Sequence, residues 1–335
     1  MKRLVNPRYL VWLAVPLLLA GALRGVSIPD IREALGTLSP VQVVALVAFN
    51  TGLVLMFSGR WWLILRAQGY RIPYLSLAGY RLVAFGISYF TLGTQFGGEP
   101  FQVHSIHKHH NIPAAVALAS VTLDKLLELL VNFTFLVIGV GVVLTAGFFG
   151  KAATTQVLLL ATGLLALPAG YLLILQTGSF PMTWFARHVL VRCSAFKEIS
   201  QLIAGAEQQV VYFCRRQPIA LLRAIALSML VWAAMVLEFW LMLHFLGLQF
   251  ELSQVIGALT AARLAFLLPV PAGLGALEAS QVIAMQALGV HPALGISISL
   301  LIRARDITIG VIGLWWAGVL ARPGAVNTLP SQAGD

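Results

Sequence analysis

Long apolar segments are the feature that most limits what this chain can fold into. The segment 113–149, for example, contains only three charged side chains, Asp124, Lys125 and Glu128. A helix of about 20 apolar residues is long enough to cross a bilayer. Charged residues make up 10% of the whole chain, whereas soluble domains have about 25%. This composition excludes a soluble enzyme, a DNA-binding domain and a disordered chain, and we expect an all-α polytopic membrane protein.

Six segments are predicted to cross the membrane as helices. They are 9–23, 41–65, 113–149, 154–175, 219–248 and 292–320. A cleaved signal peptide is the alternative for the first of them, but we favour retention because further crossings follow directly. An even number of crossings places both termini on one side. The basic residues Lys2 and Arg3 at one end and Arg322 at the other predict that this side is the cytoplasm.

Two further apolar segments are interrupted by glycine and proline. The segment 75–92 runs into such a stretch at 93–100, and the segment 252–290 is interrupted at 268–275. Glycine is unfavourable inside a helix, and proline removes a hydrogen-bond donor. We therefore predict two re-entrant helical hairpins in addition to the six spanning helices.

The organisation along the chain indicates a single transmembrane domain over residues 1–322, followed by a short tail at 323–335. The longest part expected outside the membrane is 177–218, where basic residues outnumber acidic ones and apolar residues recur at helical spacing. Such a pattern predicts an amphipathic helix on the cytoplasmic membrane face. The net charge of +10 then fits cytoplasmic lysine and arginine rather than a nucleic-acid partner.

The end of the second predicted crossing carries an aromatic and basic group of residues. Its members are Arg60, Trp61, Trp62, Arg66 and Arg71. Tryptophan is enriched at membrane interfaces, and positive charge favours the cytoplasmic side. We therefore expect this end to lie at the cytoplasmic interface of a bacterial inner membrane.

The two interrupted segments share landmarks at equal spacing. Glu99 precedes Pro113 by fourteen positions, and Glu278 precedes Pro292 by the same number. Eleven positions beyond those prolines come Asp124 and Arg303, respectively. On the predicted crossings the two halves face opposite ways, which indicates an inverted repeat over about 41–149 and 219–321, as in many transporters. Coincidence between common glycine and proline breaks is the alternative.

Charged residues within the apolar segments form the candidate site. Six acids (Glu99, Asp124, Glu128, Glu238, Glu278, Asp306) and five bases (Arg81, Lys125, Arg263, Arg303, Arg305) fall there. Inserting each charge at bilayer depth costs about 2.5–3.5 kcal/mol of free energy unless the charge is ion-paired or hydrated. We predict that they bind a substrate headgroup, with the bases holding a phosphate. Ion pairs that only fix helix register are the alternative, and Glu99 and Glu278 are also placed to cap half-helices.

The predicted substrate-binding residues are Arg81, Glu99, Asp124, Lys125, Glu128, Arg263, Glu278, Arg303, Arg305 and Asp306. No catalytic residue, metal site or cofactor is predicted, because the sequence has no nucleophile, zinc or phosphate-loop motif. Four histidines between His104 and His110 suggest a solvated strip near lipid headgroups more than a metal site.

Four motifs carry a resemblance to a known family. They are Gly98-Glu99-Pro100, the run from Asp124 to Glu128, the run from Leu268 to Glu278, and the run from Leu301 to Asp306. With them the whole chain resembles the lysylphosphatidylglycerol synthetase membrane region, or flippase-like domain. That family includes the membrane half of the multiple peptide resistance factor, which moves aminoacylated phospholipids between leaflets. It also includes stand-alone members linked to hopanoid, glycolipid or polyprenyl-phosphate pathways. The first two of these motifs together resemble the first signature of the family. That signature commonly reads Glu-Arg before a later Asp, whereas here Asp124-Lys125 precedes Glu128.

The resemblance implies a lipid transporter for an amphiphilic lipid with a phosphate- or sugar-containing headgroup. No soluble aminoacyl-transferase domain follows Arg322, so it does not imply lipid synthesis by this chain. An intramembrane transferase and a scaffold for a lipid-synthesis enzyme are the alternatives. The expected partners are a membrane lipid, a lipid-synthesis enzyme and a second copy of the chain.

Overall fold

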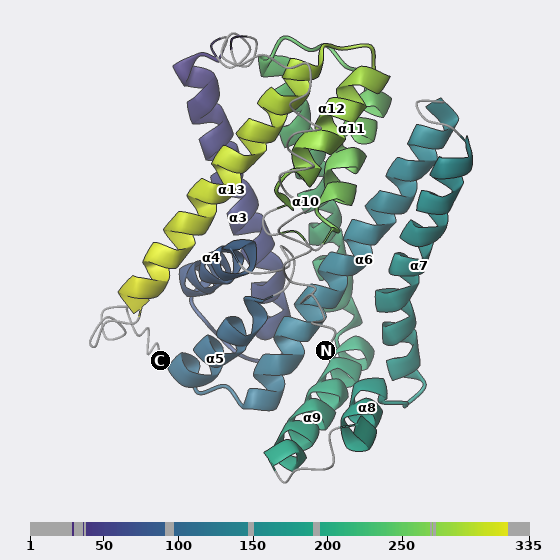
Figure 1. Ribbon diagram of the computed structural model, residues 1–335. Coiled ribbons are helices and arrows are strands. Elements are labelled where there is room, and N and C mark those ends of the chain that lie inside the picture. Colours follow the sequence, from purple (N-terminus) through teal and green to yellow (C-terminus); the bar gives the residue numbers. More distant parts are fainter. Residues whose placement is uncertain are drawn as a thin grey trace, which may run out of the picture.

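The computed structural model describes Pro29, Gly36 and residues 38–90, 97–146, 151–189, 195–268, 270 and 273–320. In this part of the chain the regular structure is helical, and no strand occurs. The expected all-α class is therefore confirmed (Figure 1). The predicted first crossing, 9–23, and the tail at 323–335 lie outside the described residues.

Eleven helices, α3 to α13, follow one another from residue 40 onwards in the described part. They are α3 (Pro40–Ala67), α4 (Tyr74–Phe90), α5 (Glu99–His110), α6 (Ala114–Ala146), α7 (Lys151–Gln176), α8 (Pro181–Val189), α9 (Ala195–Arg216), α10 (Pro218–Phe245), α11 (Leu252–Ala265), α12 (Ala276–Ala287) and α13 (Pro292–Leu320).

Four of these helices are long and apolar enough to cross a membrane. They are α3, α6, α7 and α10, and each coincides with a predicted crossing. The last predicted crossing corresponds to α13, whose 29 residues also suffice in length. Its centre, however, carries Arg303, Arg305 and Asp306. No stretch of α13 is therefore both long enough to span the membrane and as apolar as the other four helices. The chain is thus a multi-pass helical membrane protein.

The two interrupted segments both form a helix, a break and a second helix. α4 and α5 have 17 and 12 residues, and α11 and α12 have 14 and 12. Each pair follows a 28-residue helix that begins with proline, α3 or α10, and precedes a long helix, α6 or α13. Helices α3–α6 form the first unit, and helices α10–α13 form the second unit.

The two units also contact each other in a reciprocal way. α3 packs against α10, while α4 of the first unit packs against α13 and α11 of the second unit packs against α6. In Figure 1 the α4–α5 pair lies in the lower half of the molecule and the α11–α12 pair in the upper half. The charged residues near both breaks are thereby brought to the middle of one helical bundle.

The segment between the units forms two amphipathic helices, α8 and α9. The apolar face of α9, which includes Ala206, Val210 and Phe213, is buried against α6, α7 and α10. Protein therefore covers this part of α9, whereas Ile199, nearer the start of the helix, is exposed. On α8, by contrast, Trp184 and Phe185 are exposed.

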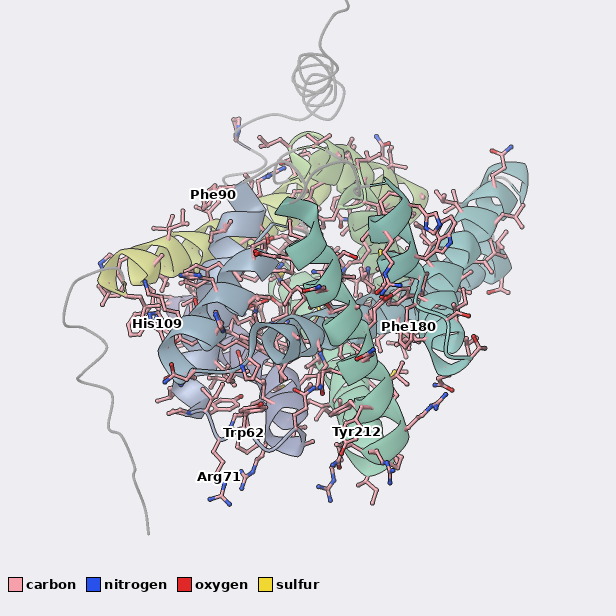
Figure 2. The ribbon with its side chains drawn as sticks, turned by 90° about the horizontal axis from the view of Figure 1, so that it is seen from below. Trp62, Arg71, Phe90, His109, Phe180 and Tyr212 are labelled. Carbon is pink, nitrogen blue, oxygen red and sulfur yellow. The ribbon has the colours of Figure 1, made fainter. Side chains whose placement is uncertain are left out.

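The aromatic and basic end of α3 divides into outward and inward residues. Trp62 is partly buried and Arg66 stacks over its ring at 4.7 Å, while Arg71 extends away from the helices (Figure 2). Trp61, however, is fully buried, and its indole nitrogen donates a hydrogen bond to Ser120 Oγ at 3.2 Å. The interface interpretation thus does not apply to Trp61, because the helix turns this residue toward α6.

Candidate functional site

A cavity of about 260 Å³ lies inside the bundle, between the two units. Its walls come from α3, α4, α5, α6, α10, α11 and α13. Eight of the ten predicted substrate-binding residues line it: Arg81, Glu99, Asp124, Lys125, Glu128, Arg263, Arg305 and Asp306. The other two, Glu278 and Arg303, are not among the lining residues. Apolar and aromatic side chains such as Phe57, Phe85 and Trp232 complete the walls.

The first charge cluster (Arg60, Arg81, Glu99, Asp124, Lys125 and Glu128) belongs to the first unit. Its centre is the pair of carboxylates on α6, four residues apart and therefore on one helical face. Arg81 donates to Asp124 Oδ2 at 2.5 Å and to Glu128 Oε2 at 2.7 Å. Lys125 Nζ lies 2.9 Å from Glu128 Oε1 and 3.4 Å from Glu99 Oε1. Three cations therefore share three carboxylates in this cluster.

The second charge cluster (Glu238, Arg305 and Asp306) joins α10 to α13. Arg305 Nη1 lies 2.8 Å from both oxygens of Glu238, and its Nε donates to Asp306 Oδ1 at 2.8 Å. The Glu238 side chain is only 2% exposed. Here the long helix supplies the arginine, and its neighbour α10 supplies the more deeply buried carboxylate.

Glu278 and Arg303 form a separate buried pair next to the second break. Arg303 Nη2 donates to Glu278 Oε2 at 2.8 Å and to the carbonyl of Gly273 at 3.1 Å. Glu278 also accepts a hydrogen bond from the Gly275 N–H at 2.9 Å, at the start of α12. The pair therefore ties α12 and the break to α13.

Glu99 has the corresponding place at the first break. Its carboxylate accepts a hydrogen bond from the Gly97 N–H at 2.8 Å, at the start of α5. Glu278 therefore caps its half-helix, because Gly275 is the N-cap residue of α12. Glu99 does not cap α5 in this way, because Gly97 precedes the N-cap residue Gly98, which has no side-chain cap hydrogen bond. Glu99 differs from Glu278 because it also faces the cavity.

Comparison with known proteins shows which family the chain matches. The family described as the lysylphosphatidylglycerol synthase TM region matches residues 8–313. The chain belongs to this family. It is also similar to two archaeal proteins, both named UPF0104 membrane protein. The one from Methanocaldococcus jannaschii is 22% identical over 290 residues, covering 83% of this chain and 84% of the relative. The one from Methanothermobacter thermautotrophicus is 22% identical over 278 residues, covering 79% and 80%.

Arg60 belongs to the first charge cluster of this lysylphosphatidylglycerol synthase TM region. The sequence had instead predicted that Arg60 lies at the cytoplasmic membrane interface. It is 2% exposed, and it lies 2.6 Å from Asp124 and 3.1 Å from Glu128. The interface interpretation is wrong for Arg60, because the side chain points into the bundle. With Arg60 included, the intramembrane charges become six acids and six bases.

A signal for Arg60 was present in the spacing of the two units. Arg60 stands twenty positions after Pro40 in α3, and Glu238 stands twenty positions after Pro218 in α10. Both side chains are buried and ion-paired. The register of the two 28-residue helices therefore indicates an inward position for both.

Arg263 differs from the other cations of the site. Within the described residues it makes no ion pair, whereas Arg60, Arg81, Lys125, Arg303 and Arg305 all do. Its guanidinium carbon lies 5.0 Å from the centre of the Trp232 ring, and its Nη2 contacts the sulfur of Met235 at 3.7 Å. Its Nε is buried and has no hydrogen-bond partner.

The histidines of α5 lie at the end of that helix and away from the charge clusters. His110 Nε2 lies 3.2 Å from the Tyr80 hydroxyl, and the His109 ring stacks on the Tyr80 ring. Among the described residues, no group of three His, Cys, Asp or Glu side chains is placed to hold a metal ion. The described contacts of His109 and His110 are thus with an aromatic residue of α4, while His107 Nδ1 lies 2.7 Å from the carbonyl oxygen of Ile112.

Proposed function

We propose that this protein moves an amphiphilic lipid, with a phosphate- or sugar-containing headgroup, between the leaflets of the membrane. The observation that carries the proposal is the charged cavity between the two units. Its lining includes five carboxylates and four cations, within a bundle whose outer faces are apolar. Charges at membrane depth are costly, and they commonly mark a substrate pathway.

The size of the cavity favours a headgroup over a whole lipid. Pockets that enclose drug-sized ligands usually measure about 300–1,000 Å³, and this one measures about 260 Å³. A headgroup fits such a volume, whereas two acyl chains do not. In the proposed mechanism, the acyl chains therefore remain in the bilayer while the headgroup passes through the bundle.

The proposed mechanism treats the two units as an inverted repeat around the cavity, each with one re-entrant hairpin. Their equal helix order and reciprocal contacts support this interpretation, and so does the position of the two breaks in opposite halves of the molecule (Figure 1). In such transporters the substrate site lies at the interface of the repeats.

The proposed orientation places α5, α8 and α9 on the cytoplasmic side of a bacterial inner membrane, with both termini on that side. These helices lie together at the lower end of the molecule in Figure 1. Exposed arginines occur in the last turn of α3, just after it and in the last turn of α9: Arg66, Arg71, Arg215 and Arg216. This distribution agrees with the positive-inside rule.

A pair of tryptophan substitutions on one helix tests the proposal. Ile309 on α13 lines the cavity, whereas Ile307, two positions earlier, is 44% exposed on the outer surface. The variants Ile309→Trp and Ile307→Trp add the same volume inside and outside the cavity. Purified proteins would be reconstituted in vesicles with fluorescently labelled phosphatidylglycerol or glucosyl diacylglycerol, and lipid movement would be followed by dithionite quenching.

We expect the wild-type protein and Ile307→Trp to move at least one of the two lipids, and Ile309→Trp to move neither. Equal lipid movement by all three proteins, at equal protein content, would contradict transport through the cavity. Absence of movement in the wild type for both lipids would contradict the proposed function.

A further inference from the structure

The cations of the cavity differ in how completely their charge is already neutralised. Arg81 and Lys125 each contact two carboxylates, and so does Arg305. Arg263 lines the same cavity, but no carboxylate of the described residues is paired with it. Arg263 is half-buried, and its Nε is buried without a hydrogen-bond partner. A cation held in the protein interior without a direct ion pair is unfavourable in the empty protein, so its presence calls for a functional explanation.

The relation between the two units shows why Arg263 lacks a partner. Both Arg81 and Arg263 lie on the helix before a break, and both stack over an aromatic ring of the preceding helix, Phe57 and Trp232 respectively. Arg81 pairs with Asp124 and Glu128 of the long helix that follows.

The corresponding positions on the second long helix carry no acid. Counted from Pro113 and Pro292, the positions of Asp124 and Glu128 are occupied by Arg303 and Ile307. Arg303 is paired with Glu278, and Ile307 is exposed on the outer surface. The second unit therefore retains the arginine and its aromatic support but lacks the two carboxylates.

The contacts of Arg263 leave its hydrogen-bonding capacity largely unused. The guanidinium carbon lies 5.0 Å from the centre of the Trp232 ring, and Phe135 stacks on Trp232 with ring centres 4.3 Å apart. A cation–π contact is an electrostatic attraction to the ring and does not replace hydrogen bonds from the N–H groups. A guanidinium presents those N–H groups as a fork that fits two oxygens of a phosphate or carboxylate.

We propose that Arg263 is the anion-binding residue of the cavity and that it takes a phosphate group of the lipid headgroup. The inference rests on the proposed function and deepens it, because it selects a phosphate-bearing headgroup over a neutral sugar. The paired cations neutralise the carboxylates of the two clusters. Trp232 holds the Arg263 guanidinium in place and shields it from the acyl region.

Binding measurements in detergent test this assignment independently of transport. The probes are dihexanoyl phosphatidylglycerol, octyl glucoside as a neutral sugar amphiphile, and sodium phosphate as a free oxyanion. The proteins are the full-length wild type, Arg263→Gln, Arg263→Lys, and Arg66→Gln as a control at an exposed arginine outside the cavity. Affinities would be obtained by calorimetry and by the rise in unfolding temperature with ligand.

We expect Arg263→Gln to bind dihexanoyl phosphatidylglycerol at least about tenfold more weakly than the wild type, since it loses hydrogen bonds to a charged group. Arg263→Lys should fall between the two, because it keeps the charge and loses the fork. Arg66→Gln should match the wild type, and the weak binding of octyl glucoside should not depend on residue 263.

The unfolding temperature of the ligand-free variants separates binding from a structural role. If Arg263 serves only the fold, Arg263→Gln must be less stable than the wild type. On the present proposal it removes a half-buried charge that has no direct ion pair among the described residues, so its unfolding temperature without ligand should equal or exceed that of the wild type.

Two results would overturn the inference. One is phosphatidylglycerol binding that is unchanged in Arg263→Gln. The other is equally tight, Arg263-dependent binding of sodium phosphate, which would assign the site to free oxyanions and not to a lipid. If binding depends on Arg263 but vesicles show no lipid movement, the anion site stands and the proposed transport fails. If lipid moves but binding ignores residue 263, the proposed transport stands and this inference fails.

Discussion

The two units have closely similar helix order but differ in the sign of several buried charges. In the first unit the long helix α6 carries the carboxylates, and the arginines come from α3 and α4. In the second unit the long helix α13 carries the arginines, and the carboxylates of Glu238 and Glu278 come from α10 and α12. The sign of the charge is therefore reversed between Arg60 and Glu238 and between Asp124 and Arg303. It is kept between Arg81 and Arg263, which both lie on the helix before a break.

This reversal shows that neutralisation at membrane depth is a property of the assembled bundle. A buried charge is tolerated when an opposite charge faces it, whichever helix supplies it. Arg60 and Glu238 occupy the same position in α3 and α10, and each meets the opposite sign on the long helix of its own unit.

The largest expected effect comes from removing Arg60. Substitution to glutamine leaves Asp124 and Glu128 without one of their shared partners in a buried site, and breaking such a pair costs about 3–5 kcal/mol. The free energy of unfolding in detergent would be measured with denaturant, with Arg66→Gln as the exposed control. A decrease of less than about 1 kcal/mol in the free energy of unfolding would mean that Arg60 behaves as an exposed charge at the membrane interface.

The two glutamates next to the breaks, Glu99 and Glu278, provide the next comparison. Glu278 is 7% exposed at its side chain and Glu99 is 25% exposed. We expect Glu278→Gln to reduce stability by about 2–3 kcal/mol and Glu99→Gln by about 1 kcal/mol, because the cost of an unpaired partner rises with burial. Thermal unfolding of both variants checks the order, and a larger loss for Glu99→Gln would contradict it.

The glycines before α5 and α12 are needed for different reasons. A Cβ on Gly98, whose φ is −88°, would lie 2.2 Å from the carbonyl oxygen of Ala84, whereas Gly275 has a φ of +78°. We expect each alanine variant to cost about 1–3 kcal/mol.

Asparagine separates the two causes. Asparagine tolerates positive φ better than alanine, so Gly275→Asn should be milder than Gly275→Ala. Gly98→Asn should be worse than Gly98→Ala, since it adds atoms to a crowded site. Unfolding temperatures of the four variants provide the measurement, and the same ranking at both positions would refute the distinction.

The smallest expected effect on stability concerns α9, which lies in the chain between the two units and belongs to neither of them. Burial raises the pKa of the Cys214 thiol, so the folded protein holds that proton more tightly than the unfolded chain does. Its contribution to stability is present below the ordinary pKa and is lost as the pH rises through the raised value.

Thiol labelling tests this environment directly. In a Cys193→Ser background, maleimide should react with Cys214 more slowly at neutral pH than with a free thiol, and the rate should increase only at higher pH. Labelling as fast as in the denatured protein would mean that α9 is not packed on the first unit.

Much of the fold was predictable from the sequence. Five of the six predicted crossings have a corresponding long helix in the described part, and both breaks occur where glycine and proline interrupt the apolar segments. Eight predicted site residues meet in one cavity. The inward position of Arg60 was not predicted, because an arginine near the end of an apolar helix is compatible either with the membrane interface or with the interior of the bundle.

The sequence by itself determined that this is a helical membrane protein and where its helices break. Only the tertiary structure decided which charges pair and that Arg263 has no carboxylate partner among the described residues. Periodicity places a residue on a face of its own helix. It does not determine the rotation of neighbouring helices, and ion pairing requires their side chains to meet within a few ångströms.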